Sequence, residues 1–152
     1  MNNQQIIGSA NNAGTPISKV LYTGKVHITG GREGAAKSTD EHLNVALSTP
    51  GGPGKGTNPE QLFAAGWSAC FIGAMRHNAT ALKIPLPEDV AVDAEVDLAT
   101  GPDGFALQAR LNVSLPGLTY DQAKVVIEAA HQTCPYSKAT RGNINVEINV
   151  VL

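Results

Sequence analysis

The chain has 152 residues, of which 42% are apolar, and this is enough for one compact domain with an ordinary core. Its formal net charge is −2 and its pI is about 6.0, so we expect no basic surface for nucleic acid or for an anionic membrane. The first residues lack a secretory signal, and no run approaches the roughly 18 apolar residues of a membrane span. We therefore expect a cytoplasmic protein, whose reducing surroundings disfavour a permanent structural disulfide between its two cysteines.

The first half of the chain begins with a polar stretch. Residues 1–17 are expected to be flexible, and residues 18–152 to form the single domain. Within that domain "VLYTGKVHIT" (20–29) and "HLNVALS" (42–48) have the composition and alternation of strands. The glycines of "GGREG" (30–34) predict the turn that follows the first strand.

A long helix is predicted from Pro59 to about Leu82, directly after the glycine-rich loop "TPGGPGKGT" (49–57). Asn58 is a good N-cap, and proline suits the first helical position. Bulky apolar residues occupy much of the helix circumference, which predicts a buried central helix. Small residues recur on one stripe that would allow another helix to approach closely: Gly66, Ala69, Cys70, Gly73 and Ala74.

The second half of the chain predicts a hairpin, a helix and a last strand. "VAVDAEVDLAT" (90–100) and "FALQARLNVSL" (105–115) alternate apolar and polar residues around the turn "GPDG", which indicates an antiparallel hairpin. A capping box that starts at Thr119 opens a second helix, which Pro135 ends. "INVEINVVL" (144–152) is the last strand. The order β-β-α-β-β-α-β, without alternating βαβ units, predicts an α+β fold.

The two cysteines leave several interpretations open. Cys70 lies among small apolar residues, where burial would raise its pKa and keep it inert unless a cation is brought to it. Cys134 is expected at the C-terminal end of the second helix, where the helix dipole opposes thiolate formation. A proline-led loop follows it, and that loop could move. The pair is therefore either core filler or catalytic, and in the second case Cys70 attacks and Cys134 resolves.

Other candidate chemistry is weaker. A metal site that uses His131 and Cys134 matches no compact zinc spacing. The stretch "GGPGKGT" lacks the glycine spacing and the Ser or Thr of a phosphate-binding loop. Taken alone, Arg32 is typical of a solvated turn and Glu60 of a helix start. We expect no metal site.

Three stretches resemble the signature regions of the organic hydroperoxide resistance (Ohr) proteins of the Ohr/OsmC superfamily: "YTGKVHITGGREG", "NPEQLFAAGWSACFIGAM" and "CPYSKATRGNINV". The resemblance extends over residues 18–152 and favours the Ohr branch. It implies antiparallel sheets wrapped around a central helix in an intertwined homodimer. It also implies a thiol peroxidase that reduces organic hydroperoxides, fatty-acid hydroperoxides included, in defence against oxidative stress. No cofactor would be bound, and dihydrolipoyl groups of a lipoylated protein would be the reductant.

Carried across position by position, the resemblance implies four catalytic residues. Cys70 would be the peroxidatic cysteine and form a sulfenic acid, and Cys134 would resolve it to a disulfide. Arg32 and Glu60 would be the active-site arginine and glutamate. An arginine near the sulfur would favour the thiolate, and the carboxylate would hold the arginine in place.

The spacing of two of these residues predicts how the site is assembled. Glu60 and Cys70 lie ten residues apart on one helix, or about 15 Å of rise, so they cannot share a site within one chain. Antiparallel packing of two central helices about a twofold axis would bring Glu60 beside Cys70 of the partner subunit. For the apolar part of the substrate, the candidate pocket residues are Phe71, Met75, Phe63 and Trp67, although core packing also explains them.

Alternative functions remain at this stage. An OsmC-branch peroxidase would share the fold, and preference for alkyl hydroperoxides over hydrogen peroxide would distinguish the branches. A non-enzymatic redox sensor or ligand-binding domain would not consume peroxide with a recycling dithiol. A purely structural dimer would have unreactive thiols at neutral pH.

Overall fold

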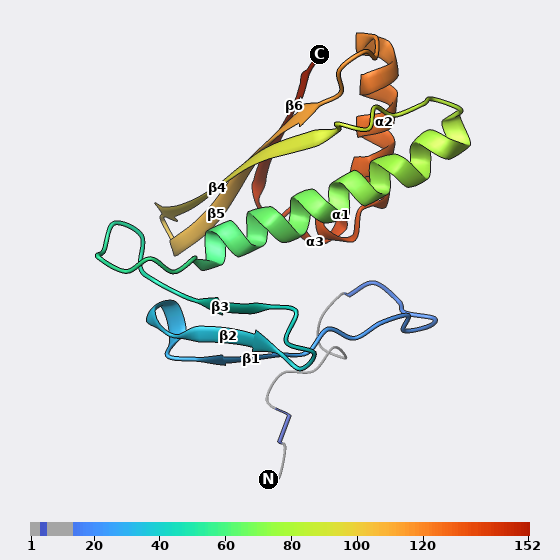
Figure 1. The fold of residues 1–152 in the computed structure, drawn as a ribbon. Coiled ribbons are helices and arrows are strands. Elements are labelled where there is room, and N and C mark those ends of the chain that lie inside the picture. The colour runs from blue at the N-terminus through green and yellow to red at the C-terminus, as the bar shows by residue number, and fades with distance from the viewer. Residues whose placement is uncertain (1–3, 6–13) are drawn as a thin grey trace.

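The computed structural model describes residues 4–5 and 14–152. A long helix, α1 (Pro59–Leu82), separates a small N-terminal sheet from the rest of the chain (Figure 1). A second sheet and the helices α2 (Tyr120–Thr133) and α3 (Pro135–Thr140) lie on its other side. The α+β class expected from the sequence is confirmed. The predicted flexible segment 1–17 falls largely outside the described residues, and its flexibility stays a prediction.

The N-terminal sheet has three antiparallel strands in the order β1-β2-β3: β1 (Val26–Thr29), β2 (Ala35–Ser38) and β3 (Asn44–Ala46). The first strand is shorter than predicted, and β2 was not predicted at all, because its four residues show no clear alternation. A 3-10 turn, η2 (Gly31–Glu33), replaces the simple turn expected between β1 and β2. A side chain at Gly34 would place its Cβ 1.7 Å from the carbonyl oxygen of Thr29, so only glycine fits where the turn closes.

The bounds of α1 agree with the prediction. The Asn58 side chain accepts a hydrogen bond from the backbone N–H of Gln61 at 2.9 Å, and Pro59 occupies the first turn. At the other end Lys83 adopts the left-handed conformation that closes many helices. One face of α1 is buried: Trp67, Phe71, Met75 and Ala79.

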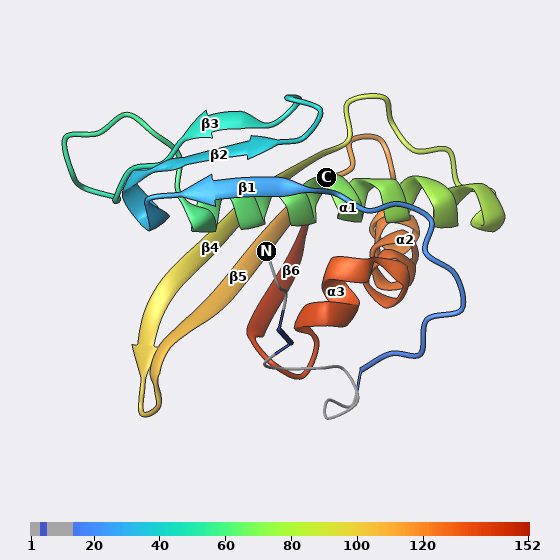
Figure 2. The same cartoon turned by 90° about the horizontal axis from the view of Figure 1, so that it is seen from below.

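The second sheet has the order β4-β5-β6: β4 (Ala91–Gly101), β5 (Gly104–Ser114) and β6 (Asn145–Val151). β4 and β5 form the predicted antiparallel hairpin. β5 and β6 pair in parallel, which corrects the expectation of antiparallel sheets without a βαβ unit. The reason is that a parallel pair needs a crossover, and α2 and α3 supply it between the two strands. In Figure 2 the N-terminal strands run alongside α1, whereas β4 and β5 cross it at an angle.

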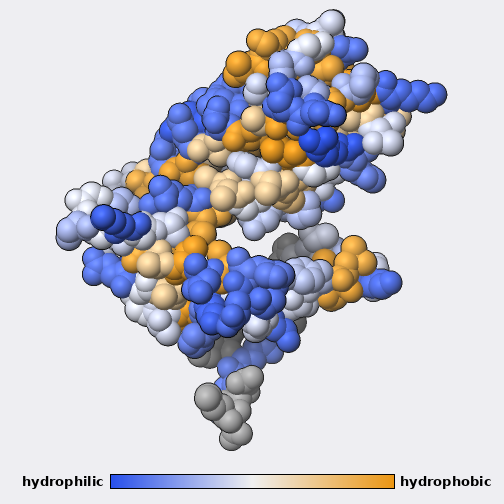
Figure 3. Space-filling model, in the orientation of Figure 1, coloured by the Kyte–Doolittle hydropathy of each residue, from blue (hydrophilic) through white to orange (hydrophobic). Residues whose placement is uncertain are grey.

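The core lies between α1, α2 and the inner face of the second sheet. The apolar residues Ala109, Leu111 and Val113 of β5 point to this side and are fully or almost fully buried. Thr119 and Gln122 form the predicted capping box at the start of α2. By contrast, all four residues of β1 are exposed, and Figure 3 shows apolar surface over α1 and below it. The N-terminal sheet therefore contributes little to the core of a single chain.

Candidate active site

The two cysteines meet where α1 passes the junction of α2 and α3. The thiol of Cys134 donates a hydrogen bond to the sulfur of Cys70, and the two Sγ atoms are 3.2 Å apart. Both are free thiols; Cys134 is fully buried and Cys70 is half-buried. A disulfide has an S–S length of about 2.05 Å, so closing it needs an approach of only about 1.2 Å. The structure thus places the pair within reach of disulfide formation.

The surroundings of Cys70 oppose its ionisation. Burial raises the pKa of the Cys70 thiol, and the neighbouring Cys134 raises it further, because a negative charge on one sulfur disfavours a negative charge on the other. The backbone amide of Tyr136 acts in the opposite direction but is the smaller effect. The expectation from its apolar neighbours is therefore confirmed. Cys70 becomes a good nucleophile only if a cation approaches it.

The segment after Cys134 is a helix, which corrects the prediction of a proline-led loop that can move. Cys134 is both the C-cap of α2 and the N-cap of α3, and Pro135 occupies the first helical position of α3. The indole Nε1 of Trp67 donates a hydrogen bond to Ser137 Oγ at 3.2 Å, and both side chains are fully buried. Proline can end one helix or begin another, and the sequence pattern did not distinguish the two.

Arg32 and Glu60 form the second pair of predicted residues. The Arg32 guanidinium donates to both carboxylate oxygens of Glu60, at 2.6 and 2.9 Å. Arg32 lies on the 3-10 turn and Glu60 in the first turn of α1. The bonded guanidinium lowers the pKa of the Glu60 carboxyl, although partial burial works against this. A hydrogen bond from Thr49 to Glu33 at 3.0 Å ties the same turn to the glycine-rich loop.

Within one chain these two pairs are separate. Glu60 and Cys70 occupy the same helix ten residues apart, which is about 15 Å along its axis. Of the predicted stripe of small residues, Ala69 and Gly73 are exposed, whereas Tyr136 of the same chain covers Gly66. Ala65, one turn before Ala69, is exposed as well. A Cβ added at Gly73 would meet no atom within 4 Å. The chain therefore holds two separate pairs of predicted site residues and an open stripe of small residues on the same helix.

A pocket of about 330 Å³ lies beside the Arg32–Glu60 pair. Its other lining residues are mostly apolar: Pro59, Phe63, Leu98, Phe105, Ala106 and Leu107. The predicted pocket residues Phe71 and Met75 are fully buried in the core cluster and do not line this pocket. Their packing favours the core role, so a contact with substrate stays a prediction. Phe105 was missed because it sits at the exposed end of a strand, where alternation no longer signals burial.

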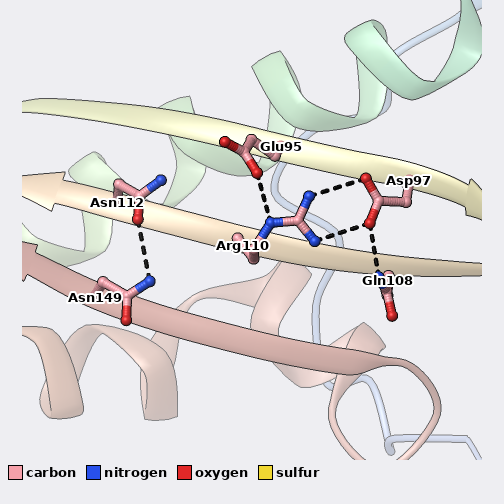
Figure 4. Close-up of polar contacts among 6 residues, drawn as sticks. All are labelled: Glu95, Asp97, Gln108, Arg110, Asn112 and Asn149. Carbon is pink, nitrogen blue, oxygen red and sulfur yellow. Dashed lines mark hydrogen bonds and ion pairs between the residues drawn. The ribbon is translucent and has the colours of Figure 1, made fainter.

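A polar network covers the outer face of the second sheet (Figure 4). Arg110 forms two hydrogen bonds with Asp97, at 2.8 and 3.0 Å, and one with Glu95 at 2.5 Å. Gln108 adds a bond of 2.7 Å to Asp97. The bonds to Asp97 lower its pKa to about 2; those from Arg110 have the larger effect and the one from Gln108 the smaller. The network links β4 to β5 and explains why polar residues alternate with the core positions.

Outside the segments 1–3 and 6–13, no group of three or more potential metal-binding side chains occurs. Over the same part of the chain, no helix has the length and apolar character needed to cross a membrane.

The chain is similar in sequence and in structure to several known proteins. A family model described as "OsmC-like protein" matches residues 51–149. An organic hydroperoxide resistance protein of Xanthomonas axonopodis pv. citri is 48% identical over 136 residues, which are 87% of this chain and 96% of that protein. An uncharacterized protein of Acinetobacter baylyi is 49% identical over 138 residues, or 89% of this chain and 96% of the other. The crystal structure of an organic hydroperoxide resistance protein from Legionella pneumophila shares 45% identity with a TM-score of 0.82, covering 88% of this chain and all of that one.

Proposed function

This chain belongs to the OsmC-like protein family, and we propose that it acts in organic hydroperoxide defence as a thiol peroxidase of the Ohr type. The relatives that carry the name organic hydroperoxide resistance protein support this assignment. The observation that carries it is the pair of reduced thiols at 3.2 Å, one half-buried and one fully buried. Such a pair suits a cycle that alternates between dithiol and disulfide.

The first step of the proposed cycle is attack on the peroxide. The Cys70 thiolate attacks the distal oxygen of ROOH, the O–O bond breaks, and the alkoxide takes up a proton and leaves as alcohol. Cys70 keeps the distal oxygen as a sulfenic acid. Because burial raises the pKa of Cys70, the step requires a cation that stabilises the thiolate and the charge developing on oxygen. The Arg32 guanidinium, held by Glu60, is that cation.

The second and third steps return the enzyme to its starting state. The sulfur of Cys134 attacks the sulfenic sulfur of Cys70, and the hydroxyl leaves as water with the proton of the Cys134 thiol. The distance of 3.2 Å in the reduced state supports a rapid closure. A dihydrolipoyl dithiol on a lipoylated protein then reduces the disulfide by thiol–disulfide exchange. The lipoyl group becomes the disulfide, and Cys70 and Cys134 return to thiols. No cofactor needs to remain bound.

We place the complete site at the interface of an intertwined homodimer. Arg32 lies with Glu60, about 15 Å along α1 from Cys70 of the same chain. The exposed stripe of small residues on α1 would let the same helix of a second protomer pack against it in the antiparallel sense. The exposed N-terminal sheet would also pack against the second protomer. So would the apolar segment before it, in which Leu21 is 88% exposed and Tyr22 81% exposed. This arrangement would give two composite active sites per dimer.

The substrate would place its apolar part in the pocket beside Arg32. Phe63, Leu98 and Phe105 are the large apolar residues of its lining, which also includes the charged pair. An alkyl or aromatic group would therefore lie against the β4–β5 hairpin, with the peroxide oxygens near the guanidinium. This geometry favours organic hydroperoxides over hydrogen peroxide, which has no apolar group to bury.

The experiment that tests the function is consumption of cumene hydroperoxide by the purified protein with dihydrolipoamide as reductant. Wild type should turn over, Cys70→Ser should consume none, and Cys134→Ser should consume one equivalent and stop. A preference for hydrogen peroxide would instead favour an OsmC-branch enzyme. Absence of turnover in wild type, with thiols that still oxidise, would leave a redox sensor and refute the proposal.

A further inference from the structure

A second link joins the two helices that carry the cysteines. Trp67 lies one turn before Cys70 on α1, and Ser137 lies one turn after Cys134 on α3. Their hydrogen bond, Trp67 Nε1 to Ser137 Oγ at 3.2 Å, therefore runs beside the pair of sulfurs, one helical turn away. Two connections of different chemistry thus bridge the same pair of helices.

The hydrogen bond restricts where α3 can lie. Both side chains are fully buried, so no water reaches either partner while α3 holds its observed position. A buried indole N–H without an acceptor costs free energy, which makes the observed position of α3 the favoured one. The ring of Tyr136 packs over Gly66, because a Cβ at that glycine would lie 2.9 Å from the tyrosine oxygen. The same ring meets Phe63 edge to face, with centroids 6.2 Å apart.

We infer that the Trp67–Ser137 hydrogen bond is a positioning device that keeps Cys134 within reach of the sulfenic acid on Cys70. The inference rests on the proposed function, because it concerns the resolving step of that cycle. Trp67 and Ser137 form and break no bond in the proposed cycle. They act through the position of α3, which begins at Cys134 itself.

The resolving step competes with a damaging one, and the competition makes the inference measurable. In resolution, the Cys134 thiol and the Cys70 sulfenic acid give a disulfide and water. In overoxidation, a second ROOH converts the sulfenic acid to a sulfinic acid and leaves as alcohol. Slower closure therefore raises the ratio of sulfinic acid to disulfide at a given peroxide concentration. The first attack on peroxide is not affected.

The test measures that ratio by intact-protein mass spectrometry after a pulse of cumene hydroperoxide. Ser137→Ala leaves the indole N–H unpaired, and the ratio should rise about 5-fold to 30-fold, as expected for a penalty of about 1–2 kcal/mol. Ser137→Thr keeps the hydroxyl and should restore the ratio toward wild type. Ser68→Ala is the matched control, because the Ser68 hydroxyl is buried on α1 without a partner and its loss should change nothing.

A second variant keeps the test valid if Ser137→Ala is poorly folded. Trp67→Phe removes the same bond from the other side while retaining an aromatic ring, and it should raise the ratio by a similar factor. An unchanged ratio in folded Ser137→Ala or Trp67→Phe, while wild type still forms the Cys70–Cys134 disulfide, would overturn this inference alone. Failure of wild type to form that disulfide would instead overturn the proposed function.

Discussion

Mixing two inactive variants should restore activity if each active site is built from two protomers. Cys70→Ser lacks the nucleophile but keeps Arg32, and Arg32→Ala lacks the guanidinium but keeps both cysteines. Each homodimer is expected to be nearly inactive. In a mixed dimer, the first variant supplies Arg32 to the Cys70 of the second, so one of the two sites is complete.

The expected recovery follows from the geometry. The guanidinium is held 2.6 Å from Glu60, and Glu60 is about 15 Å along α1 from Cys70, so Arg32 cannot keep that partner and reach the sulfur of its own chain. With equal amounts and random reassortment, about half of the dimers are mixed, and one of their two sites works. The mixture should therefore show roughly a quarter of wild-type activity.

The assay is cumene hydroperoxide consumption after joint unfolding and refolding, with distinct affinity tags to verify mixed dimers. A matched control mixes Cys70→Ser with Cys134→Ser. These two cysteines meet within one chain, so no site in that mixed dimer has both, and sustained turnover should not return. The reasoning is refuted if verified mixed dimers of the first pair stay inactive, or if an isolated monomer turns over at the rate of the dimer.

Three further changes test the fold and the pocket. Gly34→Ala should cost at least about 1 kcal/mol of stability, because its Cβ would collide with the Thr29 carbonyl; a melting temperature equal to wild type would contradict this. Phe105→Ser should raise KM for cumene hydroperoxide about fivefold while changing kcat little, and equal effects on hydrogen peroxide would exclude the apolar pocket. Asp97→Asn should lower the melting temperature at pH 7 but not near pH 2. The bonded Asp97 has a pKa of about 2, below its unfolded value, so its stabilisation is present above about pH 4 and is lost as pH falls toward 2. A constant difference in melting temperature across this range would show that Arg110 does not stabilise the carboxylate.

The sequence predicted the helix starts that are set by a few adjacent residues. The cap at Asn58 and the proline after it fixed the start of α1, and the capping box fixed the start of α2. The parallel pairing of β5 with β6 depends on where the crossover returns, which no nearby residue encodes. The helix α3 was missed because Pro135 was interpreted only as a helix end.

The site was predicted unevenly for a similar reason. Resemblance of sequence motifs proposed both cysteines, Arg32 and Glu60 as candidates. Neither the 3.2 Å separation of the sulfurs nor the double hydrogen bond of the arginine could be derived from spacing. Phe71 was proposed for the pocket because apolar residues surround most of α1. Periodicity shows which residues share a face, but it does not show whether that face is covered, and the structure buries this one in the core.

The chemistry of Cys70 and the geometry of Arg32 lead to the same requirement. Burial raises the pKa of the Cys70 thiol, so the isolated chain holds it in its unreactive form and a cation must come from outside its immediate surroundings. The Glu60 carboxyl, with its pKa lowered by Arg32, stays charged at neutral pH and keeps the guanidinium at the start of α1. A partner helix that runs in the opposite direction along the open stripe would deliver this cation to the sulfur. Arg32→Ala should therefore raise the apparent pKa of Cys70 alkylation in the dimer, and an unchanged pKa would mean that the guanidinium never reaches the thiol.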